Sequence, residues 1–186
     1  MDGPFFVDTR SPHIQTDVTA VTLSTTAKAL LPIANLPVLG SNYFGWIGKA
    51  VRLTIFGRLV TGATPGNGTA SLYWGNGTDA NGTIIVSTAA MTLTASMTSG
   101  SSWLWEMIIR CRALGTSGSL MATGTFNFLN SATSTTAASS FMVPATAPVP
   151  VTVDLTTASV ISPQFLRSGS TVESIQVHDF LFEALN

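Results

Sequence analysis

The sequence predicts an all-β protein, an antiparallel β-sandwich, on three observations. Short runs rich in Val, Ile, Thr, Phe and Trp recur at roughly the 8–12-residue spacing of sandwich strands. Clusters of Gly, Asn, Pro and Ser separate these runs. Within several runs, apolar and polar residues alternate with the period of two that a half-buried strand requires, and helical periodicity is nearly absent. With 186 residues, the chain is long enough for one sizeable core and short for two.

The first element is an extended N-terminal arm over residues 1–16, followed by a sandwich domain over residues 17–186. The arm contains Pro4, Pro12 and the apolar trio Phe5, Phe6 and Val7, with no sustained period. The trio needs an apolar surface to cover it. Two placements stay open: packing back on the home domain, or lying across a neighbouring subunit.

The β-rich runs of the domain predict eight or nine strands. In chain order they cover residues 18–24, 28–33, 49–61, 69–74, 83–87, 103–114, 119–129, 149–155 and 172–184. Pro150 places the run 149–155 at a sheet edge, because proline cannot donate a ladder hydrogen bond. Tight turns are predicted at Asn67-Gly68, Asn76-Gly77 and Asn81-Gly82. The stretch 62–68 is interpreted as a hairpin loop, and the low-complexity stretch 130–140 as a long surface loop.

Alternation assigns faces to the two longest runs. In 49–61 the core side is formed by Val51, Leu53, Ile55 and Leu59, with Arg52, Thr54 and Arg58 opposite. In 103–114 the core side is formed by Trp103, Trp105, Met107, Ile109 and Cys111. The other side of that run mixes charged and aliphatic residues, namely Leu104, Glu106, Ile108, Arg110 and Arg112. Such a mixed outer face is typical of a surface covered by a partner.

Composition also favours association with other protein chains. The chain has 8 Lys and Arg and 9 Asp and Glu residues, a charged share of 9%, beside 45% hydrophobic residues and a mean hydropathy of +0.39. Globular chains usually carry roughly a quarter charged residues. Ser, Thr, Asn and Gly supply the remaining polarity, and they lose less on dehydration than buried ions do. We therefore expect an obligate oligomer, with an unusual monomer as the alternative.

Several other classes have little support in the sequence. A net charge of −1 without any Lys/Arg run argues against nucleic-acid binding. Prolines interrupt the longest apolar stretch, so no membrane span is expected. Asp2 and Asp8 stand where a secretory signal would be basic and then apolar. Cys111 is predicted to be a buried thiol, which fits folding in a reducing cytosol.

Enzyme chemistry has few candidate residues. His178 and Asp179 are adjacent and are expected on opposite strand faces, so they would not converge as a metal or acid/base pair. The glycine-rich stretch 62–68 lacks the lysine of a phosphate-binding loop, and no G-x-S-x-G elbow is present. We expect no enzyme activity, no cofactor and no metal.

Glycan binding remains an alternative. Tyr73, Trp74 and Trp103, with Trp105, offer flat aromatic surfaces for sugar stacking, although aromatic residues in strands more often belong to the core. The triplets starting at Asn67, Asn76 and Asn81 match the glycosylation pattern, but their glycines are better explained as turns.

The order of the segments resembles tailed-bacteriophage virion proteins with a jelly-roll domain. The resemblance rests on "GKAVRLTIFGRLVTG" at 48–62, on "TASLYWGNGT", on "SWLWEMIIRCRALGTSGSLMATGTFNF" and on the ending "VESIQVHDFLFEALN". It covers residues 48–186 through patterns of small and apolar residues. It implies a trimeric jelly roll similar to the capsid decoration or cement proteins of phage heads; tail and fibre proteins share that fold.

The expected function is therefore a homotrimeric cement protein that binds the major capsid protein on the outside of a virion assembled in the host cytoplasm. The expected capsid contacts are Phe5, Phe6, Val7, Arg10 and His13. The expected subunit-interface residues are Leu104, Ile108, Arg110, Phe180 and Phe182, with the core as the alternative placement for the two phenylalanines. The alternative function is a tail, fibre or baseplate module that binds a host receptor or glycan.

Overall fold

The computed structural model of the chain describes residues 18–129 and 138–185, together with the backbone of residues 13–16. One 3₁₀ helix, η1 (Ile33–Asn35), lies within these ranges, and all other regular structure there is β. The strands are β1 (His13–Thr16), β2 (Val21–Thr22), β3 (Lys28–Ala29), β4 (Ala50–Val60), β5 (Asn67–Gly75), β6 (Thr83–Ser87), β7 (Met91–Thr92), β8 (Ser101–Ala113), β9 (Gly118–Leu129), β10 (Ala138–Val143), β11 (Val151–Val153), β12 (Val160–Arg167) and β13 (Ser174–Ala184).

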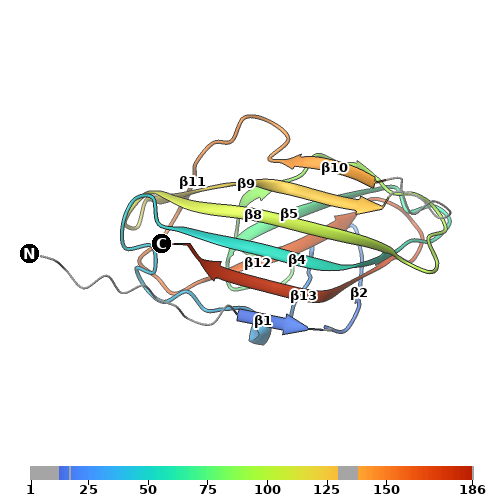
Figure 1. Cartoon of the computed structure of the whole chain (residues 1–186), viewed down its shortest axis with the longest axis horizontal. Coiled ribbons are helices and arrows are strands. Elements are labelled where there is room, and N and C mark those ends of the chain that lie inside the picture. The colour runs from blue at the N-terminus through green and yellow to red at the C-terminus, as the bar shows by residue number, and fades with distance from the viewer. Residues whose placement is uncertain (1–12, 17, 130–137, 186) are drawn as a thin grey trace, which may run out of the picture.

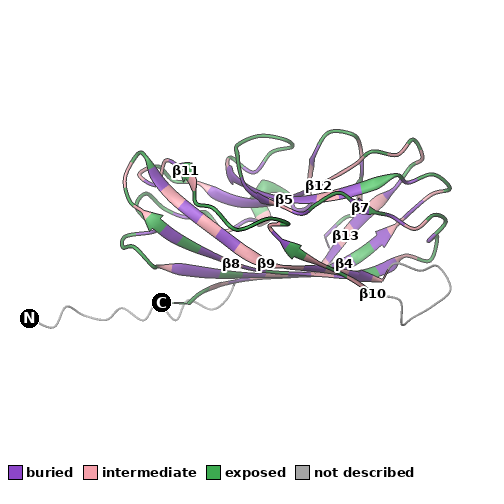
Figure 2. Ribbon diagram, turned by 90° about the horizontal axis from the view of Figure 1, so that it is seen from above, coloured by how far each residue is buried: buried purple, intermediate pink, exposed green. Residues whose placement is uncertain are grey.

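These strands form two antiparallel sheets. Among the described residues, the larger sheet has eight strands in the order β1-β13-β4-β8-β9-β10, with β2 beside β13 and β11 beside β9. The smaller sheet has the order β3-β12-β5-β6, with β7 beside β5. Figure 1 shows β13, β4, β8 and β9 side by side, and Figure 2 shows the two sheets as stacked layers. The predicted antiparallel β-sandwich is confirmed.

The strand orders are those of a jelly roll. The chain passes between the sheets from β2 to β3, β3 to β4, β4 to β5, β7 to β8, β11 to β12 and β12 to β13. The resulting sets, β2-β13-β4-β8 and β3-β12-β5-β6, match the eight strands and two sheets of that architecture. The strands β9 and β10 come between β8 and β12 in the chain and widen the larger sheet.

The core lies between the sheets, and its centre is aromatic. Phe126 of β9 stacks on Trp103 of β8 with ring centroids 5.7 Å apart, and its ring meets the edge of Trp105 at 5.8 Å. Phe126 also lies 6.2 Å from Phe165 of β12 in the smaller sheet. All four side chains are at most 1% exposed. Offset and edge-on aromatic pairs contribute roughly 0.5–1.5 kcal/mol beyond their buried area, so this cluster joins the two sheets.

Glycines make room for the largest of these side chains. A Cβ on Gly57 would lie 2.6 Å from Trp103 Cζ2 and 2.0 Å from the carbonyl oxygen of Gln176. A Cβ on Gly68 would lie 2.4 Å from Phe165 Cζ. Neither glycine has a positive φ, so it is close packing that excludes a side chain there.

Most of the predicted strands are present, with differences at the chain crossings. The long runs correspond to β4, β5, β6, β8, β9 and β13, and the run 149–155 shortens to β11, which pairs with β9 alone and is an edge strand as predicted. The runs 18–24 and 28–33 shorten to two-residue strands, because the chain crosses between sheets there. Residues 13–16 of the expected arm pair with β13, and residues 138–140 of the expected loop begin β10; residues 130–137 lie outside the described ranges.

Two of the three predicted Asn-Gly turns, Asn76-Gly77 and Asn81-Gly82, fall in the β5–β6 connection, where the hydrogen-bonded turn is formed by residues 78–81, with Asn81 N donating to Thr78 O at 3.2 Å. Gly77 and Gly82 adopt φ values of +79° and +109°. Gly68 instead lies within β5. Residues 61–66 connect β4 to β5 across the two sheets, so the stretch 62–68 is not a hairpin loop.

Strand β12 was not predicted, and Pro163 in its middle is the reason. A proline normally argues against a central strand because it lacks the N–H of the ladder. Here the carbonyl oxygen of Pro163 accepts from Leu30 N at 2.9 Å, so the same edge of Pro163 faces β3. That neighbour is a two-residue edge strand that pairs at Gln164 and Phe165, so the missing donor falls on the β3 side and the pairing with β5 continues through Pro163.

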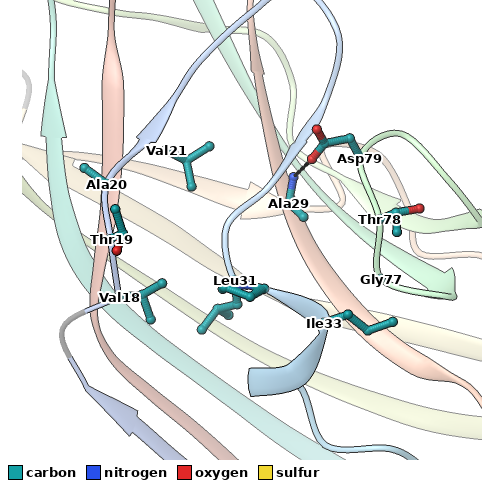
Figure 3. A pocket seen from close by; sticks show the side chains of 11 residues that line it. Val18, Thr19, Ala20, Val21, Ala29, Leu31, Ile33, Gly77, Thr78 and Asp79 are labelled. Carbon is teal, nitrogen blue, oxygen red and sulfur yellow. Dashed lines mark hydrogen bonds between the residues drawn. The ribbon is translucent and has the colours of Figure 1, made fainter.

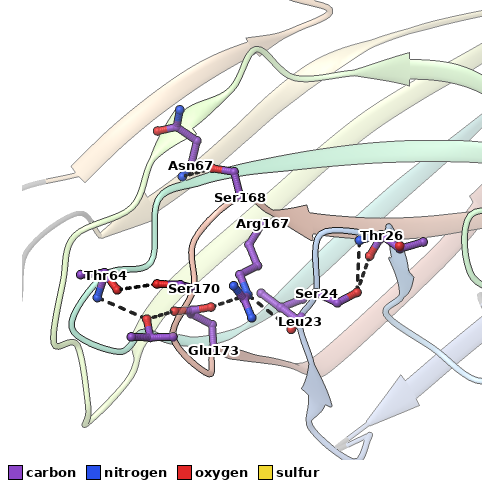
Figure 4. A network of polar contacts seen from close by, with 10 residues as sticks. Leu23, Ser24, Thr26, Thr64, Asn67, Arg167, Ser168, Ser170 and Glu173 are labelled. Carbon is purple, nitrogen blue, oxygen red and sulfur yellow. Dashed lines mark hydrogen bonds and ion pairs between the residues drawn. The ribbon is translucent and has the colours of Figure 1, made fainter.

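A buried ion pair lies at the centre of a polar network at one end of the sandwich. Arg167 Nε lies 2.5 Å from Glu173 Oε2, and the Glu173 side chain is 0% exposed; the geometry is that of an ion pair and not of a hydrogen bond. Thr171 Oγ1 donates to Glu173 Oε1. Nearby, Ser168 accepts from Asn67 N and Ser170 meets Thr64 (Figure 4). The network holds the β12–β13 connection against the β4–β5 connection.

We predict that Gly57→Ala destabilises the domain, because the new methyl group meets both a backbone oxygen and a buried indole. Overpacking of this kind costs about 1–3 kcal/mol. Gly40→Ala is the matched control, since a Cβ at that position meets nothing within 4 Å. Urea unfolding measures both; equal stability of the two variants would contradict the packing argument.

We also predict that Glu173→Ala destabilises the domain by about 3–5 kcal/mol, because Arg167 would remain largely buried without its counter-ion. The control is Glu183→Ala, which removes a half-buried partner of the exposed Arg52 at 3.7 Å and should change stability by about 0–1 kcal/mol. Thermal and urea unfolding test the difference. Similar losses in both variants would show that the buried pair has no special role.

Candidate functional site

The outward surface of the larger sheet is the main candidate site, and we call it the outer face. It comprises Arg52, Thr54, Phe56 and Arg58 of β4, Leu104, Glu106, Ile108, Arg110 and Arg112 of β8, Thr123 and Thr125 of β9, Met142 of β10, and Leu181 and Glu183 of β13. The alternating core and outer residues of β8 follow the predicted pattern throughout. Leu104 and Ile108 are half-buried here, while Phe56 is 43% and Met142 70% exposed.

The pairing register of neighbouring strands aligns the outer-face residues in rows across the larger sheet. One row runs across five strands through Leu181, Thr54, Glu106, Thr125 and Met142. The neighbouring row runs through Glu183, Arg52, Ile108 and Thr123. Side chains of the two rows line a shallow hollow of about 730 Å³. Threonine and apolar groups line most of it, and they lose less on dehydration than ions do, while Arg52, Glu106 and Glu183 are the charged groups of its lining.

The outer face also gathers much of the chain's charge. Arg52, Arg58, Arg110 and Arg112 are half of the eight Lys and Arg residues. Arg58 donates to Gln176 Oε1 at 3.2 Å, and Arg52 lies 3.7 Å from Glu183. Within the part of the chain that the structure describes, Arg110 and Arg112 have no ion-pair partner. They are exposed and available to acidic groups of another molecule.

The corresponding surface of the smaller sheet is covered by its own chain. Ser162 and Gln164 of β12 point away from the core and are 0% exposed. Gln164 Nε2 donates to Thr78 O at 2.8 Å, and Gln164 Oε1 accepts from Ala80 N at 2.7 Å. The β5–β6 connection therefore lies over β12. The outer face has no such cover among the described segments.

Three of the predicted interface residues lie on the outer face, and two do not. Leu104, Ile108 and Arg110 are all there. Phe180 and Phe182 are 0% and 7% exposed and belong to the core, so they cannot contact another subunit. The pairing register of β13 with β4 shifts at His178. Beyond this shift Phe180 and Phe182 point toward the core, and Leu181 between them points outward.

The same bulge corrects the expectation for His178 and Asp179. Val177 and Phe180 are both in the core although two residues separate them. In a bulge the extra residue breaks the alternation, so His178 and Asp179 both lie on the solvent side and not on opposite faces. Among the residues with described positions, no three His, Cys, Asp or Glu side chains gather as a metal site.

The predicted glycan platform is not at the surface. Tyr73, Trp74 and Trp103 are 7%, 6% and 1% exposed. Trp74 Nε1 donates to Asp154 O at 3.0 Å, and burial raises the pKa of Tyr73. These rings cannot stack on a sugar. Burial was the expected alternative for aromatic residues on alternating strands, and it is what the fold shows.

The predicted capsid contacts fall mostly outside the described residues. Phe5, Phe6, Val7 and Arg10 lie there. The backbone of His13 is described, and it begins the edge strand β1 opposite Phe182. The N-terminal segment therefore joins the sandwich at an edge of the larger sheet.

A groove that the sequence did not indicate lies between β2 and β3. It has a volume of about 580 Å³. Val18 and Val21 line it on one side, and Leu31 and Ile33 on the other (Figure 3). Asp79 stands at one end, where Lys28 Nζ and Ala29 N donate to its carboxylate at 2.7 and 2.8 Å. Partial burial acts to raise the pKa of Asp79, but these contacts outweigh it and hold the pKa below its usual value.

Trp46 is a second feature that sequence reasoning missed. It lies in the β3–β4 connection and is 49% exposed, whereas the other three tryptophans of the sequence are at most 6% exposed. Its neighbour Ile47 is 64% exposed. A Trp-Ile pair between glycines, outside any alternating run, was the available signal.

Comparisons with known proteins add little to these observations. No protein-family model and no curated protein matches the sequence. A legume lectin-like domain from Entamoeba histolytica is similar in structure over 90% of both chains, with a TM-score of 0.30 and 9% identity. A similarity at this level does not bear on function. No helix in the described part of the chain is long and apolar enough to cross a membrane.

Proposed function

We propose that the chain is a structural virion protein, a capsid decoration or cement protein that binds the outside of a phage head as a homotrimer. The outer face is the observation that supports this proposal most directly. It is a broad, pre-formed sheet surface with half-buried Leu104 and Ile108, exposed Phe56 and Met142, and no covering segment within the described residues. Its role is to bury this surface against neighbouring subunits.

The chemistry of the outer face suits a permanent contact. Obligate interfaces are rich in apolar groups and poor in charge at their centre. Thr54, Thr123 and Thr125 supply neutral polarity beside Leu181 and Ile108, and Glu106 is the one charged group at the middle of the five-strand row. A standard interface buries roughly 1,600 Å² in total, which a five-strand face can supply. Tight packing over such an area supports stable assembly.

The charged side chains of the outer face would fix the orientation of a second subunit bound there. Arg110 and Arg112 stand on the same strand as Glu106, and Glu183 lies at the β13 side. A rotated copy of the same face can therefore offer acids to the free arginines. Charge pairs of this kind contribute specificity and register more than affinity. A closed rotational symmetry would limit the assembly to a fixed number of subunits.

The N-terminal segment is the proposed contact with the major capsid protein. Phe5, Phe6 and Val7 supply apolar anchors, with Arg10 and His13 beside them. Buried aromatic residues are the usual anchors of tight interfaces. Each bound subunit would then stabilise the shell by joining neighbouring capsid proteins.

A tail, fibre or baseplate module that binds a receptor or glycan is the second candidate. Its expected platform of Tyr73, Trp74 and Trp103 is buried, so it would need another surface. The position of the chain on a particle separates the two candidates.

We predict that Leu104→Asp combined with Ile108→Asp converts the oligomer to monomers while the domain stays folded. Both side chains point away from the core, and buried unpaired carboxylates would be costly in an interface. Light scattering gives the mass, and circular dichroism gives the fold. Thr92→Asp, at an exposed position of β7 in the smaller sheet, is the control. A native chain that is already monomeric at working concentrations would contradict the proposal.

We further predict that removing residues 1–12 leaves the oligomer intact and abolishes decoration of phage heads. The truncation stops before β1, so the described fold is kept. Electron microscopy of heads mixed with each protein measures the bound density. Full decoration by the truncated chain would refute the role of the arm, and density on tails alone would favour the second candidate.

A further inference from the structure

Four exposed apolar side chains lie at one end of the larger sheet, and we call them the end patch. They are Trp46, Ile47, Leu114 and Leu185, with exposed fractions of 49%, 64%, 46% and 39%. Backbone hydrogen bonds hold their segments together: Gly48 N donates to Cys111 O at 2.9 Å, and Leu185 N donates to Ala50 O at 3.0 Å. The patch thus spans the adjacent ends of β13, β4 and β8.

Trp46 is held in place within the end patch. Lys49 Nζ lies 4.8 Å from the centre of the Trp46 ring and 4.0 Å from that of Tyr43. The same ammonium donates to Tyr43 O at 2.7 Å. Cation–π contacts of this kind orient the indole. A pre-organised apolar surface loses little entropy when a partner covers it, so Trp46 is suited to be a binding residue.

The N-terminal segment leaves the described structure toward the end patch. β1 runs antiparallel to β13, with His13 opposite Phe182 and Ile14 opposite Leu181. Continuing this register toward the N-terminus leads past Glu183 and Ala184 to Leu185. Phe5, Phe6 and Val7 precede His13 by eight to six residues. An extended chain of that length spans roughly 20–26 Å.

That reach is sufficient for the whole end patch. Adjacent strands lie about 4.8 Å apart, so the ends of β4 and β8 are about 5 and 10 Å from β13. The end patch is too small for a stable contact between two domains, which takes about 20–30 residues a side. A short apolar segment matches its size better.

We infer that Phe5, Phe6 and Val7 cover the end patch of their own subunit before the protein meets a particle. The contact pairs aromatic and aliphatic groups with Trp46, Ile47 and Leu114 and removes both apolar surfaces from water. It goes beyond the proposed function, which concerns the particle-bound state. Binding to a shell would then compete with this contact for the same three residues.

Acrylamide quenching of tryptophan fluorescence tests the contact in the full-length chain. Because the other three tryptophans are buried, quenching reports mainly on Trp46. Phe5→Ser combined with Phe6→Ser should raise the quenching constant and shift emission to the red. The rise should disappear in a Trp46→Phe background. Val172→Ser, at an exposed position near the other end of β13, is the matched control and should leave quenching unchanged. Unchanged quenching in the double variant would overturn the inference.

A cysteine pair tests whether the contact is within one chain. Val7→Cys with Ile47→Cys should form an intrachain disulfide on mild oxidation, seen as a chain that stays at monomer mass without reductant and has lost both introduced free thiols, which reductant restores. Cys111 is 0% exposed and should not compete, and each single variant shows its background. Cross-links only between chains, or none, would overturn the inference. Because neither experiment involves particles or the outer face, failure here is separable from failure of the proposed function.

Discussion

The contact on which the fold depends is the packing of one aromatic cluster between two sheets. Phe126 connects the tryptophans of β8 to Phe165 of β12, and close packing of such groups leaves no space for a misplaced methyl group. Gly57 and Gly68 lie where those rings approach the neighbouring backbone or strand. The residues of this cluster all belong to long strands. The two-residue strands β2 and β3 lie where the chain crosses between the sheets, and they contribute no residue to the cluster.

The core is formed within one chain and does not use the outer face, so the apolar side chains of the outer face stay exposed or half-buried. The smaller sheet is closed by its own β5–β6 connection through Gln164. The larger sheet offers Phe56, Leu104 and Met142 to the outside. Because of this asymmetry, the outer face is the sheet surface that the proposed protein partner would cover. Threonine and arginine side chains separate the apolar groups of this surface.

Some predictions made from the sequence for the candidate site agree with the structure and others do not, and the difference has physical causes. The mixed face of β8 followed from alternation alone, because period two is a property of the strand itself. Phe180 and Phe182 were ambiguous because one β-bulge reverses the faces of everything beyond it. Trp74 and Trp103 were predicted as candidates for a glycan-binding surface, but both are buried. Their burial depends on how the two sheets pack, which the pattern of one strand does not specify.

The sequence by itself determined the β-sandwich, the long strands with their inner and outer faces, and the low charge that favours association. These properties are local: they depend on alternation, on turn residues and on composition. Only the tertiary structure decided the crossings between sheets, the central position of β12 with Pro163, the buried Arg167–Glu173 pair and the end patch around Trp46. Each of these brings together residues far apart in the chain, and no short pattern encodes which distant strand supplies a neighbour.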